Sequence, residues 1–471
     1  MRKLAGFLRR NRSALLVGAL RVLTYLTLTL LFFGLMSVNN WPLRHLSRTL
    51  ATTLLTWTLT AVAMLHIYGG YDVGRKKSKP IISSMALGIL CVDLVTYLQL
   101  QIMNVNPDNN AHLTIFGADF PWLLACFALQ ALLIVVMVRL GNRLYFRLHQ
   151  SRACLLILNQ FEDAQAIAEK IGVYRLQWQV RDIALWSDPD LNRRIEAADV
   201  VFLANIPDEV RMPLLKVCYD LRRDVLCKAQ LQDIMLSAAQ PLVVDDALFL
   251  EMDYHKMTPM QLAVKRSMDI LVSLTVLIVL SPLMLLISLA ILLDDGAPVL
   301  FRQQRLTSGG RCFTIRKFRT MRRDAEALAP DVSEQADDPR ITRVGHFLRK
   351  WRLDELPQLW NILIGDMTLV GPRPEMLGNV EKYKSALPTF VYREKMKAGL
   401  TGYAQIEGRY NTSPEDKLML DLMYIENFSL WNDVRLLFRT LTVFFKKDST
   451  APFRAADPSA SPAEGRKDET V

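Results

Sequence analysis

Four apolar stretches near the amino terminus limit what this chain can fold into. They occupy residues 14–36, 50–68, 81–103 and 121–139. Each is close to the roughly 20 residues that a helix needs to cross a lipid bilayer. We therefore predict a transmembrane bundle of four helices within residues 1–150. A cleaved signal peptide is the alternative for the first stretch, but that stretch is long for one and lacks a small-residue cleavage site.

Lys and Arg residues around these stretches predict their orientation, because positive residues collect on the cytoplasmic side of membrane helices. They cluster before the first stretch, after the second and after the fourth, whereas residues 104–120 contain none. Both ends of the bundle are therefore expected in the cytoplasm. The formal net charge is +10, but the sequence has no run of five basic residues and no nucleic-acid motif, so we expect no nucleic-acid partner.

The next part of the chain, residues 151–255, alternates short apolar runs with helical patterns. Runs such as residues 154–158 and 200–204 are typical of parallel strands that are joined by helices. We predict a Rossmann-like α/β domain on the cytoplasmic side. Residues 159–164 follow the first run and contain no glycine that would let a pyrophosphate approach the backbone. A structural or regulatory role is therefore favoured over nucleotide binding.

A third unit is predicted over residues 265–447, followed by a disordered tail over residues 448–471 that is rich in Ala, Pro, Ser and charge. The unit begins with a further apolar segment, residues 267–293, which is long enough to span a membrane. Pro282 at its centre and basic residues on both sides favour a helical hairpin that enters and leaves on the cytoplasmic side. A kinked spanning helix is the alternative.

Two adjacent carboxylates, Asp354 and Glu355, lie shortly before Pro357. Proline is tolerated in the first turn of a helix, so the pair is predicted at a helix amino terminus, where backbone N–H groups attract phosphate. This position would keep Asp354 ionised as a nucleophile or metal ligand. An isolated Asp-Glu pair is more often a helix cap with a stabilising charge. The cysteines and histidines are scattered, without the spacing of a transition-metal site.

Basic residues from separate short segments complete a candidate phosphate site. They are Lys317, Arg319, Arg349 and Arg373. Guanidinium groups bind phosphate oxygens in bidentate fashion, and a diphosphate needs several such contacts plus a divalent cation. Taken singly, such residues are more often solvated or paired in salt bridges. Arg373 differs because Pro372 and Pro374 restrict its backbone, which pre-organises a contact residue.

The ordered motifs of residues 265–447 resemble the bacterial sugar transferases, the monotopic phosphoglycosyl transferases. The motifs are Ser281-Pro282, Lys317-Phe-Arg-Thr-Met, Leu353-Asp-Glu-Leu-Pro-Gln, Gly365-Asp-Met and Gly371-Pro-Arg-Pro. The preceding helices and α/β unit are similar, in architecture only, to the long form of that family, which includes undecaprenyl-phosphate glucose and galactose phosphotransferases. Arg305-Leu-Thr307 departs from the Arg-x-Gly of many members.

The resemblance implies a Mg²⁺-dependent transfer of a sugar phosphate from a UDP-sugar to undecaprenyl phosphate. Asp354 would attack the donor, release UMP and hold the sugar phosphate covalently, and it would also contact the metal. Glu355 would assist as a metal or proton partner. Substrate-binding residues are expected at Lys317, Arg319, Arg349, Arg373 and Arg409. Glucose is the expected sugar, with galactose or an acetamido sugar as alternatives.

The resemblance also implies an α+β membrane protein of the bacterial inner membrane. Its four-helix bundle and Rossmann-like domain would precede a catalytic domain that a re-entrant helix holds on the cytoplasmic face. The product would start the synthesis of an exopolysaccharide, a capsule or O-antigen. A homodimer is expected on family grounds. An inactive membrane scaffold is the alternative from another functional class, and the intact carboxylate pair argues against it.

Overall fold

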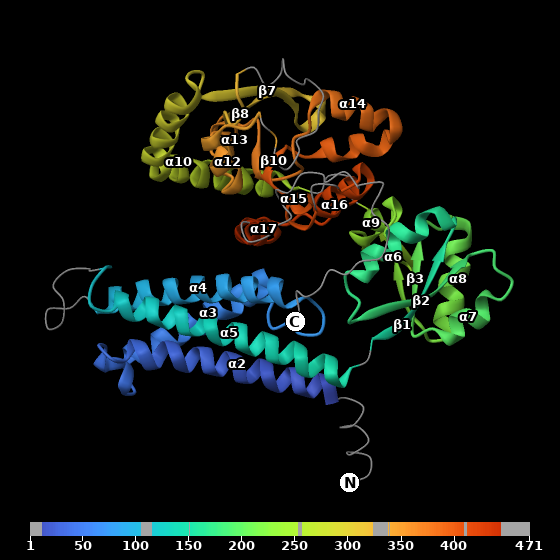
Figure 1. Cartoon of the computed structure of the whole chain (residues 1–471), viewed down its shortest axis with the longest axis horizontal. Helices are drawn as coiled ribbons and strands as arrows, with labels where there is room; N and C mark the ends of the chain where they lie inside the picture. The colour runs from blue at the N-terminus through green and yellow to red at the C-terminus, as the bar shows by residue number, and fades with distance from the viewer. Residues whose placement is uncertain are drawn as a thin grey trace, which may run out of the picture. The chain divides into compact units, whose positions relative to one another are not determined.

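The computed structural model describes residues 12–104, 115–149, 151–252, 257–323, 338, 340–408 and 412–443. Arg409 and the tail predicted over residues 448–471 lie outside this described part. The chain divides into two compact units, one built mainly from Met1–Lys228 and the other from Ala229–Arg466. Figure 1 shows both units and labels most of their helices and several of their strands.

Long apolar helices form the first part of the first unit. They are α2 (Arg12–Met36), α3 (Arg48–Tyr68), α4 (Ser78–Met103) and α5 (Phe120–Leu148). Helix α4 packs on α3 and α5, and α5 also packs on α2. A shared core includes Phe32, Tyr97, Leu100 and Ile134, while many leucines and valines face outward. Each of these helices is long and apolar enough to cross a membrane.

A parallel sheet follows, with the strand order β2-β1-β3-β4. The strands are β1 (Arg152–Leu158), β2 (Trp178–Leu185), β3 (Val200–Ala204) and β4 (Asp224–Cys227). The connecting helices are α6 (Ala164–Gly172), α7 (Leu191–Ala197) and α8 (Asp208–Asp220). The central strands β1 and β3 contribute to apolar clusters on both faces, which explains their uninterrupted apolar runs. The alternation of strands and helices agrees with the sequence pattern.

The second unit begins with helix α9 (Leu231–Ser237), and its buried Ile234 belongs to the main core of that unit. The division by contacts therefore falls near residue 228, whereas the sequence pattern places it at residue 255. A hairpin of β5 (Gln240–Val244) and β6 (Ala247–Glu251) follows, with apolar side chains exposed along both strands.

Helix α10 (Pro259–Asp295) contains the apolar segment in which a hairpin was predicted. Figure 1 draws this helix as two arms that meet at a bend. Met268 and Val272 of the first arm pack on the main core of the second unit. Ile287 and Ile291 of the second arm pack with Phe318 and Leu348 of the same unit. Both arms therefore bind one unit, although length and composition alone would also allow α10 to cross a membrane.

The remaining elements of the second unit surround short strands. Strands β7 (Leu300–Leu306) and β8 (Cys312–Phe318) are antiparallel, and β9 (Thr368–Val370) pairs in parallel with β10 (Gly399–Thr401). The helices are α12 (Arg343–Lys350), α13 (Gln358–Ile364), α14 (Leu377–Ala386), α15 (Tyr403–Glu407), α16 (Pro414–Glu426) and α17 (Leu430–Val443). Phe390, Leu418 and Leu422 lie at the centre of the core that these elements share.

Candidate active site

The two adjacent carboxylates lie on a short 3₁₀ turn, Leu353–Glu355, directly ahead of α13. Arg352, just before the turn, has a φ of 52°, a left-handed conformation that is unfavourable for a residue with a side chain. Leu353 and Leu356 pack against the apolar cluster of Ile287 and Ile291. These apolar contacts anchor the turn on α10, so the carboxylates between them have a defined position.

Glu355 is held by two cations from distant parts of the chain. Its Oε1 lies 3.6 Å from Lys317 Nζ, on β8, and 3.7 Å from Arg373 Nη2. Burial pushes the pKa of Glu355 upward, but Lys317, Arg373 and Arg352 outweigh this effect and bring the pKa below its usual value. Burial lowers the pKa of Lys317, against the opposing effect of Glu355. Glu355 is therefore an ionised group that organises the cations around it.

Asp354 has a different environment, although it is the next residue. Burial and the charge of Glu355 raise its pKa to about 6, and Lys317 and Arg349 oppose the shift. Within the described part of the chain, Asp354 makes no ion pair. Two neighbouring carboxylates with pKa values shifted in opposite directions suit different chemical roles. Of the two carboxylates, only Glu355 is paired with cations in the described residues.

Arg349 and Arg319 were both predicted to bind substrate, and the structure places them differently. Arg349, on α12, donates from Nε to Thr320 Oγ1 at 2.8 Å, and its charge lowers the pKa of Asp354. Arg319 is buried and donates to the carbonyl oxygens of Asp295 and Gly296 at 3.0 and 2.6 Å. It therefore binds the carboxyl end of α10, where helix carbonyls lack internal partners.

The Gly371-Pro-Arg-Pro segment is fixed by hydrogen bonds to its backbone. Gly371 N donates to Thr401 O at 2.8 Å, and the carbonyl of Pro372 accepts from Gly399 N at 2.8 Å. A Cβ atom on Gly399 would lie 2.1 Å from Gly371 N, so the two backbones can approach this closely only because this residue is glycine. The carbonyl of Arg373 accepts from Arg393 Nη2 at 2.8 Å. The arginine that reaches Glu355 thus projects from an ordered loop.

Arg305 belongs to this site and was not identified from the sequence as a substrate contact. It lies on β7 and donates from Nη1 to the carbonyl of Pro374 at 3.2 Å. Burial, followed by the nearby charge of Arg373, lowers the pKa of Arg305 to about 10. Its only sequence signal is its position in the motif that departs from Arg-x-Gly.

The oxygen ligands at this site fit magnesium only in part. No group of three or more His, Cys, Asp or Glu side chains that could hold a metal lies among the described residues. Mg²⁺ is often bound by one or two carboxylates together with substrate phosphates and water. Asp354 suits that arrangement because it is half-buried and without an ion pair in the described residues, whereas Glu355 already lies beside two cations. The residues therefore fit a metal that arrives with a phosphorylated substrate.

Comparison with known proteins identifies the family to which the second unit is similar. Residues 260–447 match a family described as bacterial sugar transferase. A UDP-N-acetylgalactosamine-undecaprenyl-phosphate N-acetylgalactosaminephosphotransferase of Aeromonas hydrophila is 41% identical over 187 residues, which cover 39% of this chain and 44% of that protein. A UDP-glucose:undecaprenyl-phosphate glucose-1-phosphate transferase of Escherichia coli strain K12 is 39% identical over 186 residues, covering 38% and 39%.

A third relative is a shorter protein, so the match covers more of its length. The UDP-glucose:undecaprenyl-phosphate glucose-1-phosphate transferase of Caulobacter vibrioides is 40% identical over 191 residues, which are 39% of this chain and 71% of that protein. The match thus spans less than half of the first two relatives and most of the third. The matched region contains the carboxylate pair, Lys317 and Arg373. This chain belongs to the bacterial sugar transferase family.

Proposed function

We propose that this chain transfers a sugar 1-phosphate from a UDP-sugar to undecaprenyl phosphate and releases UMP. The observation that carries the proposal is the difference in ion pairing between the two carboxylates. Glu355 is paired with Lys317 and Arg373, while Asp354 lies beside them without an ion pair in the described residues. The relatives supply the substrate class, because they include proteins named as undecaprenyl-phosphate transferases of glucose, galactose and N-acetylgalactosamine phosphates.

The reaction divides into two displacements at phosphorus. An Oδ atom of Asp354 attacks the phosphate that bears the sugar, and the bond from that phosphorus to the UMP oxygen breaks with its electron pair. Lys317 and Arg373 neutralise charge on the phosphate oxygens as the bond breaks. A phosphate oxygen of undecaprenyl phosphate then attacks the same phosphorus and releases the Asp354 carboxylate. Bound Mg²⁺ would supply additional positive charge at the diphosphate, with Asp354 as its protein ligand.

A re-entrant α10 would place this site at the membrane surface. Both arms of α10 bind the second unit, and Ile278, Val279 and Leu283 between these contacts are exposed. A straight helix of 37 residues would be about 55 Å long, which would separate its ends by more than a bilayer core. We propose that both ends lie on the cytoplasmic side of the inner membrane, where nucleotide sugars are available, and that α2 to α5 cross the membrane.

We also propose which sugar is transferred and which pathway uses the lipid product. Glucose is our first candidate, but relatives of similar identity are named for glucose, galactose and N-acetylgalactosamine. A panel of UDP-sugars incubated with undecaprenyl phosphate would identify the donor. Synthesis of an exopolysaccharide, a capsule or O-antigen is the proposed destination of the lipid product. The homodimer remains a prediction that mass measurement of the detergent-solubilised protein would test.

Incubation with a UDP-sugar in the absence of lipid tests the reaction itself. The purified enzyme should release UMP in an amount that matches a sugar phosphate bound to Asp354. Asp354→Asn should abolish both signals while the protein remains folded. Chelation of Mg²⁺ should stop UMP release. Kinetics that require both substrates before any UMP appears would contradict the covalent route, and a folded wild-type enzyme that releases no UMP under any condition would support the scaffold alternative.

A further inference from the structure

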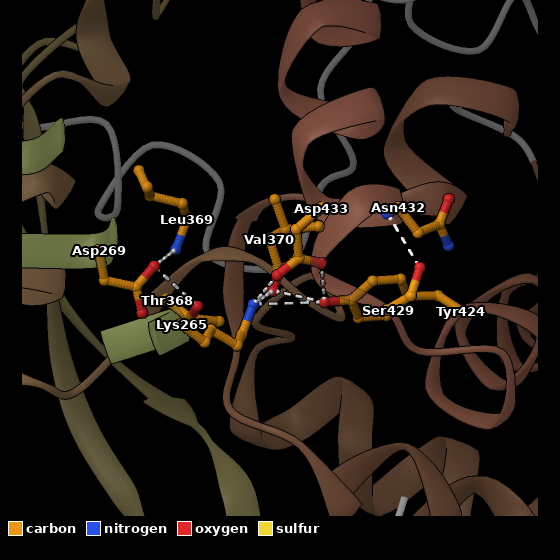
Figure 2. A network of polar contacts seen from close by, with 9 residues as sticks. All are labelled: Lys265, Asp269, Thr368, Leu369, Val370, Tyr424, Ser429, Asn432 and Asp433. Atoms are coloured by element: carbon orange, nitrogen blue, oxygen red, sulfur yellow. Dashed lines mark hydrogen bonds and ion pairs between the residues drawn. The ribbon is translucent and has the colours of Figure 1, made fainter. Parts of the chain in front are cut away.

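Lys265, in the first arm of α10, is a buried cation whose role the proposed chemistry does not explain (Figure 2). Its Nζ atom donates to the carbonyl oxygen of Val370 at 2.9 Å and lies 2.5 Å from Asp433 Oδ2. Asp433 is fully buried on α17. A buried ion pair costs desolvation energy and is often no more stabilising than apolar packing. Stability alone therefore does not explain the ion pair of Lys265 and Asp433.

Tyr424 completes the contacts around this carbonyl (Figure 2). Its hydroxyl lies 3.0 Å from Val370 O and 2.7 Å from Asp433 Oδ1, and it also accepts from Lys265 Nζ at 3.4 Å. The three side chains come from α10, α16 and α17. Lys265 and Tyr424 meet on a single backbone oxygen directly before Gly371, and Asp433 contacts both of these side chains.

Asp269, one helical turn after Lys265, extends the same pattern. Its Oδ1 accepts from Leu369 N at 2.9 Å and from Thr368 Oγ1 at 3.1 Å. Strand β9 pairs with β10 along one side. Side chains of α10 supply an acceptor and a donor to backbone groups of β9, as a neighbouring strand would do. The loop that follows β9 is thus positioned by the membrane-associated helix.

We propose that Lys265, Asp433 and Tyr424 are positioning residues that place Arg373 on Glu355 by fixing the carbonyl of Val370. Only Gly371 and Pro372 separate Val370 from Arg373, and proline restricts backbone rotation there. A displaced Val370 would therefore move the guanidinium relative to Glu355 and the donor diphosphate. This inference rests on the proposed function of the same site.

A double-mutant cycle with Arg373 separates positioning from general stabilisation. The paired change Lys265→Met with Asp433→Leu removes both charges together and so avoids an unpaired buried charge. In the full-length protein it should slow UMP release by about 100-fold, the scale expected for a misplacement of about 1 Å. Made in an Arg373→Ala background, the same pair should cause almost no further loss in kcat/KM, because the group that it positions is already absent.

A milder variant and a matched control complete the test. Tyr424→Phe removes one hydroxyl and should slow UMP release about fivefold, and again only when Arg373 is present. Lys384→Met breaks the ion pair with Glu394, 2.7 Å long in the same unit, and should leave UMP release unchanged. If the paired variant does not fold, the double-mutant cycle of Tyr424→Phe with Arg373→Ala tests the same coupling.

Two results would overturn the inference. One is that the paired variant lowers kcat/KM by the same factor in the Arg373→Ala background as in the wild type, which would show general destabilisation. The other is a paired variant as active as the wild type. Failure of the proposed function looks different, because the wild-type enzyme itself would then release no UMP.

Discussion

The two units differ in what they bury. Asp93 is the only charged residue among the buried residues described in the first unit, which otherwise buries apolar and neutral polar side chains. The second unit buries charges that contact one another or backbone groups of the same unit. They include Lys265, Asp269, Arg319, Glu375, Arg393, Asp421 and Asp433. Because buried charges are costly, their concentration in one unit marks the part of the molecule that holds chemistry in place.

Loss of Arg373 should produce the largest contrast between the units. Arg373→Ala removes a cation from Glu355 and from the proposed diphosphate, and we expect UMP release to fall by about 10²- to 10³-fold. Arg222→Ala provides the comparison in the first unit, since Arg222 is exposed there, and its activity should match the wild type. Both variants should be measured as initial rates of UMP release. Equal losses in the two variants would contradict the assignment of chemistry to the second unit.

The pH dependence of UMP release should expose the different environments of the two carboxylates. Asp354 must be ionised to attack, and its pKa is raised to about 6. The rate should therefore fall about tenfold for each pH unit below that value. In Glu355→Gln the charge that raises the pKa of Asp354 is absent, so the acid limb should move to lower pH even though the maximal rate is reduced. An acid limb that stays in place in this variant would show that another group titrates.

Truncation tests the boundary between the units. A chain that begins at Ala229 keeps α9 and its buried Ile234, whereas a chain that begins at Gln261 loses both, together with the Thr258 cap of α10. Both should release UMP in detergent or lipid. The shorter chain should unfold at a temperature lower by roughly 10 °C, as expected when a buried isoleucine and a helix cap are lost. A chain from Ala229 that is folded but inactive would show that the first unit takes part in the reaction.

The sequence predicted elements well wherever one local pattern determines them. The first apolar helix was predicted at residues 14–36 and is observed as Arg12–Met36. Helix α5 continues to Leu148, well past the predicted residue 139, because its last turns are amphipathic rather than uniformly apolar. Strand β2 was not predicted, since it lies at the sheet edge, is only partly buried and carries Gln179, Arg181 and Asp182.

The site was less predictable because tertiary contacts decide it. The sequence grouped Lys317 and Arg373 with the carboxylates, and both lie within 4 Å of Glu355, but it could not separate Lys317 from Arg319. Residues two apart on a strand point to the same side, but β8 ends at Phe318, so Arg319 is free to turn toward α10. Arg305 and Arg393 were missed because their role depends on backbone carbonyls that are distant in the sequence.

The smallest expected effect concerns the bend of α10. Pro282 lacks the N–H that would donate to the carbonyl of Ile278 four residues earlier, and Ser281 Oγ donates to that carbonyl instead at 2.8 Å. Pro282→Leu would restore the backbone donor and favour a straight helix that is long enough to span the bilayer. We therefore expect a minor fraction of molecules to adopt a crossing form, while contacts at both ends of α10 keep most molecules in the wild-type arrangement.

The exposed thiol of Cys312, which follows α10, is a natural reporter of this change. In intact spheroplasts, a membrane-impermeant maleimide should leave Cys312 of the wild type unlabelled and should label a small part of the Pro282→Leu protein. Cys312→Ser in both backgrounds identifies labelling of the other cysteines, and permeabilised cells give the total. Full labelling of wild-type Cys312 from outside would mean that α10 crosses the membrane, which would separate the carboxylates from cytoplasmic nucleotide sugars and contradict the proposed arrangement.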